Sequence, residues 1–106
     1  MIRFKPGARF ALVEPGTLRA LADFHDAWVQ AFPDVLFVVT AGTDGTHTTK
    51  SFHYVGKAWD FRTSGLTVAQ LPKLELLRRE FQRTHPGWQV LIEKDHGHVE
   101  QDGLMH

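Results

Sequence analysis

Three short stretches of the chain contain side chains that can bind a metal ion and move protons. They are Ser51-Phe52-His53, Gly56-Lys57-Ala58-Trp59-Asp60 and Glu93-Lys94-Asp95-His96-Gly97-His98. Zinc accepts imidazole nitrogens and carboxylate oxygens as ligands, and a hydrolytic centre also needs an acid that can take up a proton. Together these stretches predict a hydrolytic zinc centre.

The spacing of the residues allows such ligands to converge. His53 and Asp60 are separated by Gly56, so a turn can bring both side chains to one ion. In an extended segment His96 and His98 point to the same side, because side chains alternate along a strand. One of them can bind the metal while the other faces its open position. A polar hairpin with two exposed histidines would explain this pair equally well, but the nearby Glu93 favours the metal site.

The order of these residues is similar to that of a known family of zinc peptidases. Ser51-x-His53-x-x-Gly56-x-Ala58-x-Asp60, followed by an acid and then His96-x-His98, resembles the group that contains D-alanyl-D-alanine carboxypeptidases, lysostaphin-type endopeptidases and the hedgehog signalling domain. The nearest likeness is to the small carboxypeptidase-like domains of phage and bacterial cell-wall lytic enzymes. The matched residues span about half of the chain, from Ser51 to Glu100.

The resemblance implies a role for each matched side chain. His53, Asp60 and His98 would hold one zinc ion per chain, with water in the fourth position. Glu93 would be the catalytic base, and Ser51 would orient the substrate near the first ligand. Zinc held in this way lowers the pKa of its bound water to about 7, which provides hydroxide near neutral pH. The expected reaction is hydrolysis of an amide.

Either histidine of the last stretch, His96 or His98, can be the third zinc ligand. In one branch of the family the base lies three residues before the ligand, which would make His96 the ligand; in another it lies further away and the second histidine binds. We favour His98, with His96 as a catalytic residue that stabilises the oxyanion. Glu93 and His98 would face opposite sides of one straight strand, so this assignment requires a bend near Asp95 or Gly97.

The sequence departs from the carboxypeptidase branch in the region that supplies a substrate-binding arginine. Residues 40–45 contain no arginine. Lys50 or Arg62 would serve as a substitute anchor for a carboxylate, although a solvated charge explains each of them equally well. Strict specificity for a free C-terminal D-alanine is therefore not implied, and endopeptidase, carboxypeptidase and dipeptidase activities all stay open.

Length and composition limit the number of domains, the partners and the types of metal ligand that the chain can have. With 106 residues the chain is expected to form a single domain, residues 1–106. Its formal net charge is zero, which argues against nucleic acid as a partner, and the absence of cysteine excludes thiolate ligands and disulfides. The sequence contains neither an apolar signal segment nor an apolar run of ~20 residues. We expect a monomer that is cytoplasmic as synthesised and acts on the cell wall after release or within a larger assembly.

The periodicity of apolar residues predicts an α+β fold. A short strand is expected over 9–13, and a helix capped by Thr17 continues to Pro33 with an apolar stripe. Residues 35–39 are predicted to form a buried central strand. A helix that begins with a capping box is predicted over residues 67–84, and strands are predicted over residues 88–93 and 97–101. The expected stripe residues are Leu18, Leu21, Phe24, Trp28 and Phe32 in the first helix and Leu74, Leu77 and Phe81 in the second, while Trp59 and Trp88 are expected in the core.

These elements are expected to form an antiparallel sheet with the two helices packed on one face, as the resemblance to hedgehog and D-alanyl-D-alanine peptidases also implies. The leading functional hypothesis is a zinc metallopeptidase that cleaves the peptide stems of peptidoglycan. The alternative is a non-catalytic zinc-containing binding module of the same fold. A third hypothesis is a structural protein whose histidines are incidental.

Overall fold

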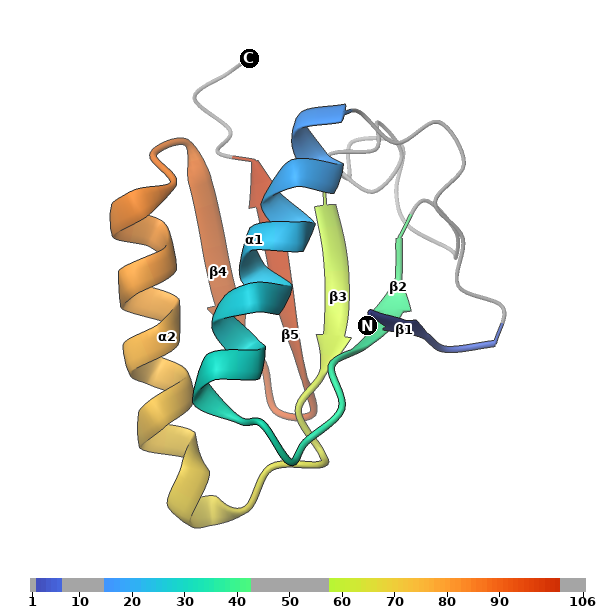
Figure 1. Ribbon diagram of the computed structural model, residues 1–106, viewed down its shortest axis with the longest axis vertical. Helices are drawn as coiled ribbons and strands as arrows, with labels where there is room; N and C mark the ends of the chain where they lie inside the picture. The colour runs from blue at the N-terminus through green and yellow to red at the C-terminus, as the bar shows by residue number, and fades with distance from the viewer. Residues whose placement is uncertain (1, 7–14, 43–57, 102–106) are drawn as a thin grey trace.

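The computed structural model describes residues 2–6, 15–42 and 58–101, which form an α+β fold with one five-stranded sheet and two α-helices (Figure 1). The strand order is β1-β2-β3-β5-β4, which places β3 at the centre. In chain order the elements are β1 (Arg3–Phe4), α1 (Pro15–Ala31), β2 (Val38–Ala41), β3 (Ala58–Arg62), the 3-10 turn η1 (Val68–Gln70), α2 (Leu71–Thr84), β4 (Trp88–Ile92) and β5 (His96–Gln101). The predicted strand over 9–13 lies outside the described residues.

The sheet is mixed, so the prediction of an antiparallel sheet is only partly right. Strands β2, β3, β5 and β4 pair antiparallel with their neighbours, whereas β1 pairs parallel with β2. A parallel pair needs a crossover between its strands, and α1 lies in the connection from β1 to β2. No local pattern in the two residues of β1 indicates this pairing.

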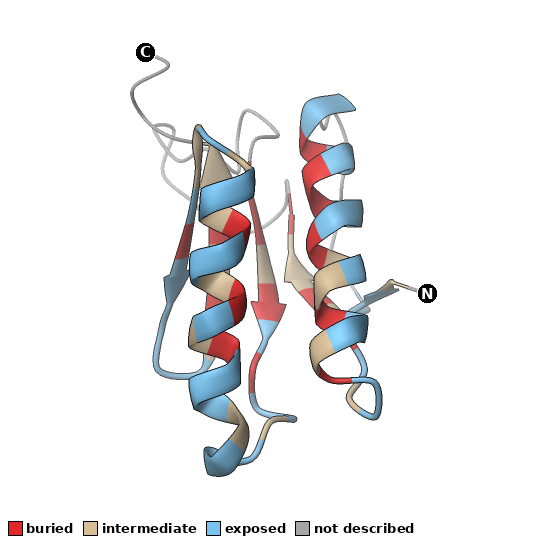
Figure 2. Cartoon of the chain, turned by 60° about the vertical axis from the view of Figure 1, so that its left-hand side comes forward, coloured by how far each residue is buried: buried red, intermediate tan, exposed pale blue. Residues whose placement is uncertain are grey.

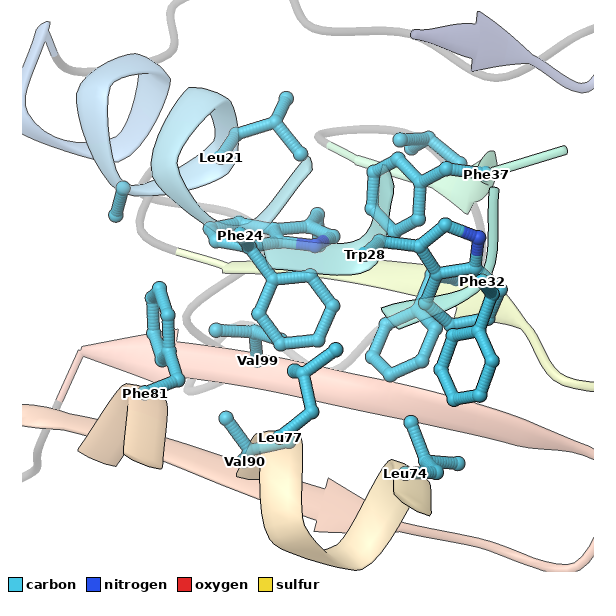
Figure 3. Close-up of a cluster of buried hydrophobic side chains, with 14 residues drawn as sticks. Leu21, Phe24, Trp28, Phe32, Phe37, Leu74, Leu77, Phe81, Val90 and Val99 are labelled. Carbon is cyan, nitrogen blue, oxygen red and sulfur yellow. The ribbon is translucent and has the colours of Figure 1, made fainter. Parts of the chain in front are cut away.

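Both helices lie on the same face of the sheet, as predicted (Figures 1 and 2). Phe24 of α1 is fully buried and contacts both Phe61 of β3 and Phe81 of α2, with ring centroids 4.9 and 5.1 Å apart. Figure 3 shows the shared core, in which side chains of both helices meet Val90 of β4 and Val99 of β5. The core therefore fixes the helical face of the sheet and leaves the opposite face for other contacts.

The first helix is close to its prediction but begins earlier and has a narrower stripe. It starts at Pro15, a residue favoured in the first turn because its missing N–H needs no partner there. Thr17 is consequently not the residue that caps the helix but is buried within it. Leu18 is 47% exposed and does not belong to the core, whereas Leu21, Phe24 and Trp28 do.

The strand predicted over residues 35–39 is shifted toward the C-terminus. The chain turns after α1, where the N–H of Val35 donates to the carbonyl of Phe32 (3.1 Å) and the indole Nε1 of Trp28 donates to the carbonyl of Val35 (2.8 Å). These local hydrogen bonds delay the strand to Val38. The strand β2 is an inner strand but not the central one.

The central strand, β3, is not among the strands predicted from the sequence. Its residues alternate: Trp59 and Phe61 are fully buried, whereas Asp60 is half-buried and Arg62 is exposed. This alternation is the signature of a strand with one face on a core. The prediction that Trp59 belongs to the core is confirmed.

The second helix agrees with its prediction in extent and stripe. Gln70 Oε1 accepts the backbone N–H of Thr67 (2.8 Å), which is one bond of the predicted capping box. That turn is a 3-10 turn, and α2 itself starts at Leu71 and ends at Thr84. Gly87 follows with φ +92°, a conformation that favours glycine, and leads into β4.

Of the two positions at which a bend is predicted, Asp95 lies in a turn and Gly97 does not. Gly97 lies in the regular part of β5, where its register partners are Phe61 on β3 and Ile92 on β4. The chain turns earlier, at Lys94-Asp95, since the N–H of Glu93 donates to the carbonyl of His96 (2.8 Å) across the turn. Gly97 is needed instead because the ring of Phe61 lies against it.

Candidate metal centre

The predicted site residues of β3 and β5 lie together on the sheet face that points away from the helices. Register pairs Asp60 with His98 and Arg62 with His96. Side chains alternate along each strand and paired residues share a face. Because Trp59, Phe61 and Val99 point into the core, these four polar side chains project from the opposite face.

Asp60 and His98 are in direct contact although they are 38 residues apart in the chain. The Nδ1 atom of His98 lies 2.7 Å from Oδ1 of Asp60. Its Nε2 atom lies 2.8 Å from Oε1 of Glu100, which projects from the same face of β5. The side chains of Asp60, His98 and Glu100 are 15%, 18% and 24% exposed. The imidazole is thus held between two carboxylates in a largely buried row.

This arrangement determines the charge of His98 in the metal-free protein. Burial lowers the pKa of His98, but the hydrogen bond and charge of Asp60, followed by those of Glu100, raise it by more, so the net shift is upward. Both ring nitrogens face carboxylate oxygens, which accept and do not donate. The imidazolium, which donates from both nitrogens, is therefore the form that satisfies these contacts.

A hollow opens beside Asp60 on this face. Its volume is about 420 Å³, and its described lining residues are Lys5, Thr40, Ala41, Asp60, Arg62, Ser64, Asp95 and His96. Pockets for small ligands commonly have volumes of ~300–1,000 Å³. The hollow therefore has room for part of a peptide, next to one of the predicted ligands.

The β4–β5 turn places a second acid beside the hollow. Asp95 Oδ1 lies 2.7 Å from Nδ1 of His96. The hydrogen bond from His96 is the main cause that lowers the pKa of Asp95. Burial, the next largest effect, raises this pKa, and the charges of His96 and Lys94 lower it further, so the net shift is downward. Asp95 is consequently an ionised carboxylate beside Asp60 and His96 in the hollow.

Glu93, the predicted base, is exposed at the end of β4 and is not among the described residues that line the hollow. Its backbone bond to His96 continues the β4–β5 ladder, so Glu93 lies on the same face as His96 and His98. The bend that the assignment of His98 requires is present, in the turn at Lys94-Asp95. The structure thus meets the geometric condition on which the prediction depends.

The structure describes only some of the predicted site. Asp60 and His98 are adjacent, and His96 lies two residues from His98 along β5, on the same face of the sheet. His53, Ser51 and Lys50 lie outside the described residues. Within residues 2–6, 15–42 and 58–101 no group of three or more His, Asp or Glu side chains is arranged to hold a metal ion. The donor types of Asp60 and His98 suit zinc, and the predicted set also requires His53.

Two acids of this face, Asp95 and Glu100, are absent from the predicted site. Their positions carry a weak signal: Asp95 directly precedes His96, and Glu100 is two residues after His98 and so on the same face of a strand. Neither position indicates chemistry without the β3–β5 register. That register is a tertiary feature.

Comparison of the chain with known protein families and with curated proteins found no match. Within the part of the chain that the structure describes, neither helix has the length and apolar character needed to cross a membrane.

Proposed function

We propose that the protein is a zinc-dependent peptidase that hydrolyses amide bonds in the peptide stems of peptidoglycan. The observation that supports this proposal most strongly is the 2.7 Å contact between Asp60 and His98 at the edge of a hollow that also contains His96 and Asp95. Two predicted ligands from distant parts of the sequence thus lie together, and one of them, Asp60, lines the open space. Their resemblance to the zinc peptidases supplies the substrate class.

In this proposal zinc is held by His53, Asp60 and His98, and when bound it activates water and polarises the scissile carbonyl. The remaining side chains of the site bind, orient and move protons. His96 lines the hollow, and its imidazolium form, which keeps the bond from Nδ1 to Asp95, donates a second hydrogen bond from Nε2 to the developing oxyanion. Ser51 orients the substrate, and Arg62 and Lys5 provide positive charge at the wall of the hollow.

Proton transfer falls to one of two acids, Glu93 or Asp95. Glu93 is the base that the resemblance implies. Asp95 is the acid that the hollow contains, and the hydrogen bond from His96 holds it in place. Either carboxylate would accept the proton of the attacking water and pass it to the leaving amine. The composition of the hollow favours Asp95 as the base. The variants Asp95→Asn and Glu93→Gln distinguish the two assignments.

Digestion of purified peptidoglycan tests the proposed activity. The native protein, loaded with zinc, is expected to release new amino or carboxyl termini from the peptide stems. Chelation should abolish this release and added zinc should restore it. Cleavage that continues at the same rate after the metal has been removed would contradict the mechanism.

The alternative function is a non-catalytic zinc-containing module that binds wall peptides. The exposure of Glu93 outside the hollow favours this alternative if Asp95 does not act as the base, because an inert module needs no base directed at its metal. A zinc-loaded protein that binds stem peptides without cleaving them would support the module and exclude the peptidase.

A further inference from the structure

The imidazole of His98 is held at both ends, and its two partners come from different strands. Asp60 on β3 contacts Nδ1 at 2.7 Å, and Glu100 on β5 contacts Nε2 at 2.8 Å. A neutral imidazole carries one N–H and one lone pair, and it binds a metal through the lone pair. Only one of these two ends can therefore face the ion.

The surroundings of the two carboxylates differ. Asp60 lines the open hollow, where an ion would be accessible to water and substrate, whereas neither His98 nor Glu100 is among the described lining residues. Glu100 instead pairs across the sheet with Ala58, which is fully buried, and with Gln89. The end of the ring that faces Asp60 is thus the end that suits a metal ligand.

We propose that Glu100 is the positioning residue of the metal centre: it accepts the Nε2–H of His98 and so directs the Nδ1 lone pair toward Asp60 and the ion. This inference rests on the zinc centre of the proposed function and gives a role to a residue to which the resemblance assigns none. Metal-binding histidines commonly donate their second N–H to a carboxylate, which fixes the tautomer and makes the ligand more basic.

The choice of tautomer explains why a second carboxylate is useful here. Without Glu100, a neutral His98 would place its proton on Nδ1 and donate it to Asp60. In that tautomer Nδ1 of His98 has no lone pair to offer the ion, and its proton engages an oxygen of Asp60, the other ligand. By holding the proton on Nε2, Glu100 keeps both Nδ1 and Asp60 available to the metal.

Zinc affinity tests the inference without using activity. Glu100→Gln keeps the size of the side chain but removes the charge, and Glu100→Asp keeps the charge on a shorter stem. Competition against a chromophoric chelator should show zinc binding that is about 10–100-fold weaker in Glu100→Gln, with partial recovery in Glu100→Asp. Glu80→Gln is the matched control, since it removes one negative charge from the exposed face of α2. Its zinc affinity should equal that of the native protein.

The side-chain ¹⁵N resonances of His98 provide a second readout. In the zinc-loaded native protein Nε2 should carry the proton and Nδ1 should show the shift of a metal-bound nitrogen. A metal-bound Nε2, or a Glu100→Gln variant that binds zinc as tightly as the native protein, would overturn the inference while leaving the zinc peptidase intact. Zinc binding that depends on Glu100 but accompanies no peptide cleavage would support the inference and overturn the peptidase. Native protein that binds no zinc would overturn both.

Discussion

Gly97→Ala should destabilise the protein, because the sheet has no space for a methyl group at this position. A Cβ atom added to Gly97 would lie 2.0 Å from Cζ of Phe61, with Cε1 and Cε2 at 2.3 and 2.6 Å. Phe61 is fully buried, and its ring packs on Phe24 and Trp28 at centroid distances of 4.9 and 5.8 Å. The ring cannot move away without disturbing the whole aromatic core.

The expected loss of stability follows from two opposing terms. Overpacking of a core costs typically about 1–3 kcal/mol. Replacing glycine in a strand returns roughly 0.5–1 kcal/mol, because alanine loses less backbone freedom on folding. Because three ring atoms would lie within 2.6 Å of the new Cβ, the overpacking cost belongs at the upper end of its range, about 2–3 kcal/mol. We therefore expect a net decrease of about 1–2.5 kcal/mol in the free energy of unfolding, which corresponds to a Tm lowered by roughly 4–20 °C for a domain of this size.

Urea unfolding of the metal-free protein, followed by circular dichroism, measures this difference. Gly16→Ala is the matched control, since a Cβ there would meet nothing within 4 Å and alanine in a helix should stabilise by up to ~1 kcal/mol. In a Phe61→Leu background, Gly97→Ala should cost less, because the smaller side chain relieves the clash. Equal urea midpoints for Gly97→Ala and the native protein would refute the reasoning.

Three further predictions concern the site. Asp95→Asn should lower kcat by a factor of about 100 or more with zinc retained, whereas Glu93→Gln should lower it by much less. A larger loss of kcat in Glu93→Gln than in Asp95→Asn, measured by peptide cleavage, would restore Glu93 as the base. Arg62→Gln should raise KM several-fold for a stem peptide with a free carboxylate but not for its amide, and equal KM changes for both would exclude an anchoring role. In metal-free protein the raised pKa of His98 stabilises the fold fully below its unfolded value of about 6.5, and this contribution disappears as pH rises through the folded value. The stability lost in His98→Gln should consequently be greater at pH 6 than at pH 9 in chemical denaturation, and a loss independent of pH would contradict the two-carboxylate arrangement.

Local patterns are sufficient to predict the helices and insufficient to predict the sheet. The stripe of Leu74, Leu77 and Phe81 and the stop before Gly87 identify α2, because helix burial and helix ends depend on residues close in sequence. The mixed sheet and the central position of β3 depend on pairing between distant strands. The motif centred on Gly56 favours a turn and conceals the alternation of Trp59 and Phe61.

The candidate site also has features that the sequence predicts and features that depend on tertiary structure. The resemblance to zinc peptidases predicts that Asp60 and His98 lie together, and in the structure the two residues are register partners on β3 and β5. It does not indicate which acid lies in the hollow, since Glu93 and Asp95 are two residues apart and only the turn at Lys94-Asp95 separates their environments. The sequence also leaves open whether the bend lies near Asp95 or near Gly97. It lies at Asp95, and the need for a small side chain at Gly97 arises from Phe61, which is distant in the sequence.

The central claim is that Asp60 and His98 hold a zinc ion, and the zinc content of untagged protein tests it most directly. Elemental analysis after zinc reconstitution and removal of excess metal should give about one zinc per chain in the native protein. His98→Ala and Asp60→Asn should each contain far less, whereas the control Glu80→Gln should match the native protein. A native protein without zinc, or variants that retain it in full, would contradict the claim.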